Sequence, residues 1–203
     1  IDTNVVPGSE EKLDMLQYCV QTLTERGYVF IGMDHFAKPD DELSIALKEG
    51  FLQRNFQGYS TYADCDLVAI GVSSIGKIGS TYSQNERDID AYYAALDAGH
   101  LPIMRGYQLN QDDILRRNII QDLMCRFSLD YQIYESVFGI PFSRYFAAEL
   151  EDMKQLETLG LVRLKPHSLT VTPKGRFLIR NIAMVFDYHL RHKETKAKYS
   201  QTV

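Results

Sequence analysis

Residues 54–61, with the sequence RNFQGYST, combine the side chains of this chain that are best suited to hold a small polar ligand. Phe56 offers an aromatic face, Gln57 can donate and accept hydrogen bonds, and Gly58 lets the backbone come close to a ligand. An apolar and glycine-rich run follows at residues 67–79. The composition is typical of a ligand-binding loop beside a buried strand, although a plain turn between core elements has a similar composition.

Asp34 and His35 form a second polar group, directly after the short aromatic and β-branched run at residues 28–32. Ligands gather at the carboxyl ends of strands in open sheets and barrels, so functional side chains are common at such a position. The alternative is that Asp34 caps a turn while His35 packs or faces solvent. The sequence leaves both interpretations open.

Three cysteines, Cys19, Cys65 and Cys125, lie far apart, and no Cys-x-x-Cys pair occurs. Their odd number and wide spacing predict buried thiols rather than disulfides or metal ligands. The glycines of residues 73–79 lack the spacing of a phosphate-binding loop. We therefore predict no catalytic residue and no metal site in this chain.

The composition is that of an ordinary globular protein, with 45% hydrophobic and 24% charged residues. No apolar run reaches the roughly eighteen residues of a membrane-spanning helix. The first residues lack the basic start and apolar core of a signal peptide, so the cytoplasm is the expected location. The missing initiating Met suggests a piece of a longer protein.

The elements that must position these residues begin with a helix from Ser9, its expected N-cap, to Gly27, its expected stop. A buried strand at residues 28–32 follows, which together with the helix predicts the αβ half of a βαβ unit. A short helix should end at Gly50, and the apolar residues 66–72 predict a second strand covered on both faces. The apolar residues expected to form the buried stripe of the first helix are Leu13, Leu16, Val20 and Leu23.

After residue 85 the pattern becomes mainly helical. Helices are expected at residues 86–98, 112–127, 131–138, 143–159 and 174–193, with a β-hairpin at residues 161–172. Three helices, a hairpin and a closing helix are typical of a winged-helix-like domain. The predicted fold is α+β, with residues 1–80 forming the end of an α/β barrel and residues 81–203 a helical C-terminal domain.

Four stretches resemble the oxygen-independent coproporphyrinogen III oxidases. They are residues 28–37 (YVFIGMDHFA), 41–43 (DEL), 54–59 (RNFQGY) and 176–182 (RFLIRNI). The resemblance extends over nearly the whole chain and concerns the C-terminal part of that enzyme. It implies the last β/α units of a radical S-adenosylmethionine (SAM) barrel, followed by the C-terminal helical domain.

Members of that family use a [4Fe-4S] cluster to cleave SAM to a 5′-deoxyadenosyl radical, which takes a hydrogen from a propionate of coproporphyrinogen III. Loss of carbon dioxide and an electron leaves a vinyl group, and two such decarboxylations give protoporphyrinogen IX. The cluster is held by a Cys-x-x-x-Cys-x-x-Cys motif, which this sequence lacks. The resemblance therefore implies that SAM and the cluster are held by the full-length enzyme, that this chain alone holds neither, and that this chain alone is inactive.

The roles of the family's binding residues can be assigned only to positions where this sequence matches the family. The resemblance implies that Phe56 and Gln57 contact a second SAM molecule and that Ile75 contacts the cluster-bound one. Because coproporphyrinogen carries four carboxylates, guanidinium groups are its expected partners. The candidates are Arg116, Arg117, Arg176 and Arg180; for each, a surface position or a local ion pair is the alternative.

Two other functions compete with this interpretation. Residues 141–203 hold 11 Lys/Arg against 6 Asp/Glu, a net charge of +5, and with the winged-helix-like pattern this suggests nucleic-acid binding. The helix at residues 143–159 is acidic, however, which makes nucleic acid an unfavourable partner. The third function is haem handling, with an axial ligand among His35, His100, His167, His189 and His192. The expected partners remain a porphyrinogen substrate and the upstream half of the same enzyme, with no membrane.

Overall fold

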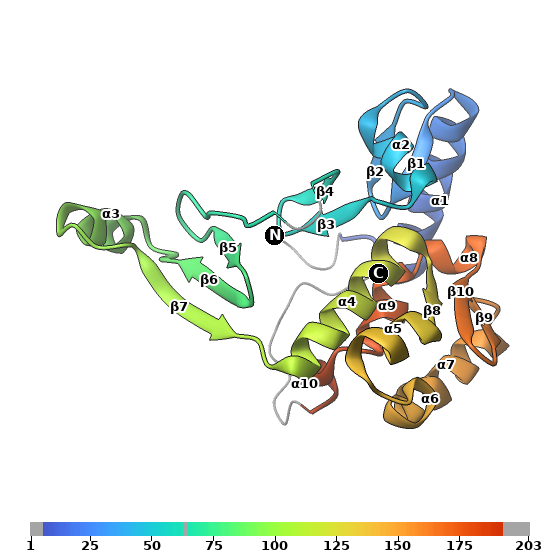
Figure 1. The fold of residues 1–203 in the computed structure, drawn as a ribbon. Coiled ribbons are helices and arrows are strands. Elements are labelled where there is room, and N and C mark those ends of the chain that lie inside the picture. The colour runs from blue at the N-terminus through green and yellow to red at the C-terminus, as the bar shows by residue number, and fades with distance from the viewer. Residues whose placement is uncertain (1–5, 63–64, 193–203) are drawn as a thin grey trace. The chain divides into compact units, whose positions relative to one another are not determined.

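The computed structural model describes residues 6–62 and 65–192. They fold into two compact units, one formed by Ile1–Thr61 with Arg116–Val203 and the other by Tyr62–Leu115. Figure 1 shows helices and short strands throughout, which confirms the α+β prediction. Across the described ranges, all pairings between strands are antiparallel and no sheet closes into a barrel. None of the helices described is long and apolar enough to cross a membrane.

Helix α1 (Ser9–Glu25) opens the first unit, and two predictions for it are wrong. Its N-cap is Gly8 rather than Ser9, and no side chain caps it. None of its residues is buried, so the expected stripe is only partly covered. The physical reason is that the helix packs against a two-stranded hairpin, which is too small to cover an apolar face.

Strand β1 (Val29–Gly32) follows helix α1, as the sequence predicts, and pairs with β2 (His35–Ala37) in an antiparallel hairpin. The βαβ unit itself stays a prediction. Gly32 lies opposite His35, and only Met33 and Asp34 connect the two strands. A connection this short allows only an antiparallel partner, because a parallel one needs a long crossover. Met33 takes the left-handed conformation, with φ 55°, at this turn.

Helix α2 (Glu42–Glu49) forms where the sequence predicts it. The Asp41 side chain accepts a hydrogen bond from the Leu43 amide at 2.9 Å, which caps the first turn. Gly50 ends the helix in the left-handed conformation. A second hairpin follows, with β3 (Gln53–Asn55) paired to β4 (Gly58–Ser60).

The rest of the first unit begins in helix α4 (Gln111–Arg126). Two reciprocal hydrogen bonds between Asn110 and Asp113 cap the N-terminus of this helix. The Asp113 amide donates to Asn110 Oδ1 at 2.9 Å, and the Asn110 amide donates to Asp113 Oδ2 at 3.1 Å. The elements that follow are β8 (Ser128–Asp130), α5 (Tyr131–Phe138), α6 (Phe142–Tyr145), α7 (Ala147–Thr158), β9 (Val162–Lys165), β10 (Ser168–Val171), α8 (Pro173–Arg176), α9 (Ile179–Met184) and α10 (Tyr188–Arg191).

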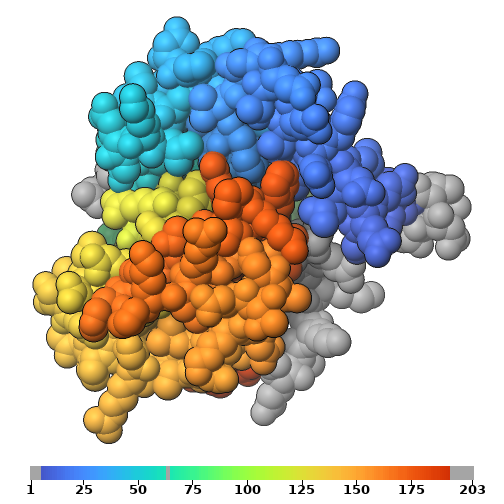
Figure 2. Space-filling model, turned by 90° about the vertical axis from the view of Figure 1, so that its right-hand side faces the viewer, coloured from blue at the N-terminus to red at the C-terminus, as the bar shows by residue number. Residues whose placement is uncertain are grey.

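The hairpin β9–β10 confirms the sequence prediction, and β8 adds a third strand beside β10. Two predicted helices are broken. Residues 143–159 divide at Phe146, where the backbone leaves the helical region, and residues 174–193 divide into α8, α9 and α10. The first unit consists of two stretches of chain, residues 6–61 and a second segment, residues 116–192. Figure 2 shows residues 6–61 lying directly on this second segment. The largest fully buried side chains of the second segment are Phe142, Phe146, Phe186, Ile119, Leu123, Leu129, Met153, Leu169, Ile179 and Ile182.

The second unit contains the sheet β5–β6–β7 and one helix. The strands are β5 (Ile75–Ile78), β6 (Thr81–Asn85) and β7 (Ile103–Gln108), and helix α3 (Ile89–Asp97) lies between β6 and β7 in sequence. In Figure 1 this helix occupies the far end of the sheet. The helix starts at Asp88, whose side chain accepts hydrogen bonds from two amides of the first turn.

The buried strand predicted at residues 66–72 is wrong. Val68 is 67% exposed and Ile70 is 84% exposed, and the segment makes one isolated bridge, between Leu67 and Lys77. The buried Asn85 side chain instead donates to two carbonyl groups of this segment. Since side chains satisfy its backbone, the segment needs no strand partner.

Candidate functional site

The candidate ligand-binding residues Phe56 and Gln57 form the two-residue turn of the β3–β4 hairpin. Asn55 pairs with Gly58 across the turn, and the Gln57 amide donates to Asn55 Oδ1 at 2.8 Å. Phe56 is 57% exposed, and Gln57 is exposed as well. The turn therefore holds its backbone in a defined conformation while its two side chains point away from the core.

Arg54 and Tyr59 lie directly opposite each other behind this turn. The Arg54 guanidinium carbon lies 5.2 Å from the centre of the Tyr59 ring. The Tyr59 hydroxyl donates to the Met124 carbonyl at 3.2 Å, which ties the hairpin to helix α4. A two-residue loop flanked by residues of alternating polarity was the available signal for a hairpin here.

Two weakly acidic side chains at this hairpin, the Tyr59 hydroxyl and the Cys125 thiol, are largely shielded from water. Burial, with a smaller contribution from Cys125, raises the pKa of Tyr59 to about 12, and Arg54 and Arg176 oppose that rise. Burial also raises the pKa of the Cys125 thiol to about 12. Both groups are therefore neutral near neutral pH, and ionising either in the folded protein is unfavourable.

Alkaline pH should therefore destabilise the protein. A folded pKa above the unfolded one gives stability that is complete below the unfolded pKa and lost as pH rises through the folded pKa. For Tyr59 that window runs from 10.0 to about 12. Urea unfolding followed by circular dichroism should show a falling midpoint in this window and a shallower fall in Tyr59→Phe. Tyr18→Phe is the control, since Tyr18 is 71% exposed, and an equal slope in all three proteins would contradict the assignment.

Ile75, the third candidate for SAM contact, lies in β5 opposite Gln84 and is partly buried. It belongs to the second compact unit, whereas Phe56 and Gln57 belong to the first. Whether the three residues line one pocket stays a prediction.

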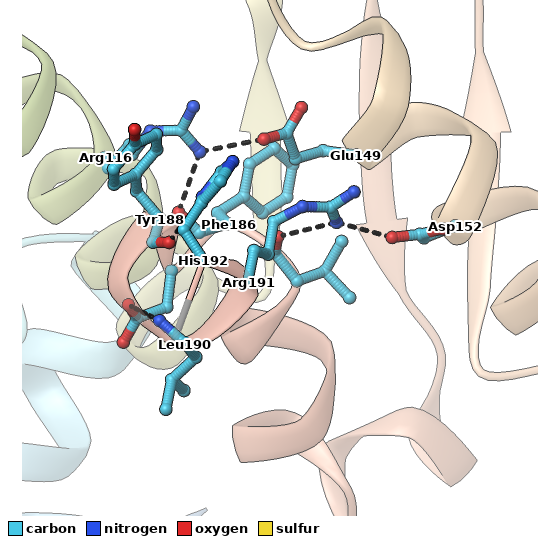
Figure 3. A network of polar contacts seen from close by, with 10 residues as sticks. Arg116, Glu149, Asp152, Phe186, Tyr188, Leu190, Arg191 and His192 are labelled. Atoms are coloured by element: carbon cyan, nitrogen blue, oxygen red, sulfur yellow. Dashed lines mark hydrogen bonds and ion pairs between the residues drawn. The ribbon is translucent and has the colours of Figure 1, made fainter. Parts of the chain in front are cut away.

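Arg116, a candidate for substrate binding, lies in a polar network of the first unit (Figure 3). Its Nη1 donates to Glu149 Oε1 at 2.9 Å and to the Phe186 carbonyl at 3.1 Å. The two charged side chains are only 11% and 7% exposed. The guanidinium carbon lies 5.1 Å from the centre of the Phe146 ring and 5.4 Å from that of Tyr188. The network joins α4 to α7 and to the residues around α10.

The other three candidate arginines differ in exposure. Arg176 donates through Nη2 to the Phe30 carbonyl at 2.8 Å, its guanidinium carbon lies 4.2 Å from the Phe127 ring centre, and burial lowers its pKa. Arg117, on α4, is partly buried. Arg180 is exposed on α9. Of the four, Arg180 is the side chain most accessible to a ligand in this structure.

The cysteines follow the prediction of buried thiols only in part. Cys125 is buried, whereas Cys19 and Cys65 are exposed. Among residues 6–62 and 65–192, no group of three or more His, Cys, Asp or Glu side chains could hold a metal ion. The donor set of the described residues therefore does not fit an iron–sulfur cluster.

Comparison with known proteins finds close relatives. A family model for the HemN C-terminal domain matches residues 109–178. The oxygen-independent coproporphyrinogen III oxidase of Synechocystis is 48% identical over 98% of this chain and 44% of its own length. The corresponding enzyme of Escherichia coli is 46% identical over 98% of this chain and 43% of its own.

A solved structure is also similar. Coproporphyrinogen III oxidase (HemN) from Escherichia coli, described as a radical SAM enzyme, superposes with a TM-score of 0.87 at 46% sequence identity. The match covers 93% of this chain and 44% of that one. The chain thus spans less than half the length of these relatives.

Proposed function

We propose that this chain serves as the C-terminal part of an oxygen-independent coproporphyrinogen III oxidase, because its sequence and fold are similar to that part of these enzymes. The whole enzyme would oxidatively decarboxylate two propionates of coproporphyrinogen III to vinyl groups, giving protoporphyrinogen IX. The observation that carries the proposal is 48% identity to one such enzyme over 98% of this chain. The chain alone is expected to be inactive.

We propose the same division of the chain that the sequence suggests. Residues 1–80 would complete the catalytic barrel, and residues 81–203 would form the helical, winged-helix-like domain. The three-stranded sheet β8–β10–β9 with its preceding helices supports the second assignment. The upstream half of the enzyme would be the partner, and the cytoplasm its location.

The cofactors of such an enzyme are SAM and a [4Fe-4S] cluster, which together supply a 5′-deoxyadenosyl radical. The described residues offer no donor set for the cluster, so the upstream half would hold it. This chain would contribute to binding SAM. Phe56 offers an exposed ring for an adenine or methionine group, Gln57 offers an amide, and Ile75 offers an apolar wall.

The binding role of the turn can be measured in the full-length enzyme. Phe56→Ala should weaken SAM binding by about fivefold or more, because an aromatic contact is worth about 1 kcal/mol beyond its buried area. Gln57→Ala should weaken it through the loss of a hydrogen bond. Isothermal titration with S-adenosylhomocysteine provides the measurement. Tyr18→Ala, an exposed aromatic position on α1, is the control. Equal affinities for all four proteins would remove the turn from the binding site.

The propionates of the substrate would be bound by arginines. Arg180→Ala should raise KM for coproporphyrinogen by about tenfold or more, since a hydrogen bond to a charged group contributes about 1.5–3 kcal/mol. Its unfolding midpoint should stay unchanged because Arg180 is exposed. Arg176→Ala should lower stability as well, because it also loses the bond to Phe30. Arg163→Ala, exposed on β9, is the control, and an unaltered KM in Arg180→Ala would exclude Arg180.

Nucleic-acid binding is the weaker candidate. Three acidic side chains of α7 are already paired with cations: Glu149 with Arg116, Glu151 with Lys154 and Asp152 with Arg191. The helix still carries Glu149, Glu151, Asp152 and Glu157 against Lys154 alone. A phosphate backbone would meet this helix unfavourably.

A further inference from the structure

The hairpins β1–β2 and β3–β4 of the first unit pack through two reciprocal contacts between a ring and a glycine. His35, the first residue of β2, lies against Gly58 at the start of β4. A Cβ atom at Gly58 would be only 3.1 Å from His35 Nε2. The ring of His35 also meets that of Tyr59 edge-on, with the centres 5.1 Å apart at 82°. The first hairpin therefore contacts the residue that directly follows the Phe56–Gln57 turn.

Gly32, at the end of β1, receives the ring of the second hairpin in the same way. A Cβ atom there would overlap the Tyr59 hydroxyl and lie 3.2 Å from Tyr59 Cζ. Each hairpin thus supplies one ring and one glycine. Because the glycines have no side chains, both rings can approach the opposite backbone. The two contacts together prevent one hairpin from sliding along the other.

The position of His35 is itself defined from two sides. Behind β1, Arg176 donates to the Phe30 carbonyl at 2.8 Å and so holds the strand in place. Asp34 Oδ1 lies 2.8 Å from His35 Nδ1, which is itself shielded from solvent. Asp34 is 82% exposed, so its attraction for the ring is weak. The ring contacts, rather than this carboxylate, hold His35.

We propose that His35 is a positioning residue that holds the Phe56–Gln57 turn in the orientation in which it binds SAM. The proposal rests on the function proposed above for that turn. Without the ring, Gly58 loses its neighbour and its backbone, at φ 137°, gains freedom to rotate. The turn would then sample other orientations, and the bound one would be populated less. His35 acts through Gly58 and Tyr59 and does not itself contact the ligand.

The first test measures the turn directly in this chain. The sequence contains no Trp, so Phe56→Trp places a single fluorophore on the turn. In that background His35→Ala should lower the steady-state fluorescence anisotropy, while His35→Phe, which keeps a ring, should preserve it. His167→Ala, an exposed histidine on the β9–β10 turn, is the matched control. If His35→Ala does not fold, His35→Gln replaces it.

The second test measures binding of S-adenosylhomocysteine to the full-length enzyme. His35→Ala should weaken binding by about tenfold, and His35→Phe should restore it to within about twofold of the unmodified enzyme. Unchanged anisotropy in His35→Ala, or an equal loss in His35→Phe, overturns the positioning role. If instead anisotropy falls while Phe56→Ala binds normally, His35 orders a turn that does not bind SAM, which overturns the proposed function of the turn and with it this inference.

Discussion

Replacing Glu149 with Ala is expected to lower the free energy of unfolding by about 3–5 kcal/mol, because it removes one partner of a nearly buried ion pair with Arg116. The pair is 2.9 Å apart and both side chains are nearly buried. Arg116 is also enclosed by the rings of Phe146 and Tyr188, so it cannot turn to solvent without unpacking them. Urea unfolding at neutral pH, monitored by circular dichroism, measures the loss.

Two further variants test whether the loss comes from breaking the ion pair between Arg116 and Glu149. Lys154→Ala on the same helix removes an exposed ion pair with Glu151 and should change stability little. Removing both buried charges in Arg116→Met with Glu149→Leu should recover much of the stability that Glu149→Ala loses. A double variant as unstable as Glu149→Ala would show that the carboxylate matters for some other reason.

Gly175→Ala is expected to destabilise the protein by about 3 kcal/mol or more, at the upper end of the range for an overfilled core. An added Cβ would overlap the Leu161 carbonyl oxygen and lie 2.9 Å from both the Leu161 carbonyl carbon and Val171 Cγ1. Two of those three atoms are backbone, so helix α8 would have to move away from the β9–β10 hairpin. Thermal unfolding followed by circular dichroism would measure this as a lower melting temperature.

Gly8→Ala is the control for that substitution. Nothing lies within 4 Å of a Cβ at Gly8, and its backbone φ of −67° suits any residue. Because Gly8 is the N-cap of α1, where Ala is less favourable than Gly, the melting temperature of this variant should fall only slightly. A Gly175→Ala protein that melts at the same temperature as Gly8→Ala would show that α8 shifts without cost.

Local signals in the sequence predicted the elements that depend only on neighbouring residues. Helix α2 is closed by Asp41 and Gly50, and the β9–β10 hairpin turns at Pro166 and His167, as their residue types indicate. Elements that depend on distant partners were mispredicted. Residues 66–72 have the composition of a buried strand, but their backbone bonds to side chains of Asn85 and Tyr92. Composition alone contains no information about those partners.

In the candidate site, too, features set by neighbouring residues could be predicted and features set by distant residues could not. The stretch that contains Phe56 and Gln57 was selected from residue types, because aromatic, amide and glycine side chains in sequence are a local signal, whereas the SAM contacts of these two residues come from the resemblance and stay a prediction. The partners of Arg116 could not be identified in this way, because Glu149 and Phe186 lie 33 and 70 residues away in sequence. Its pair with Glu149 is the local ion pair that the sequence analysis gave as the alternative to substrate binding.

The exposure of all six residues of strand β7 has a consequence for the energetics of the second unit. None of the six residues of β7 is buried, and none of the nine residues of α3 is either. Opening these elements exposes little additional apolar surface, so their local unfolding costs far less free energy than unfolding of the aromatic core around Phe142. Their backbone amides should exchange with deuterium well before those of α4, so this segment can change conformation without loosening the core.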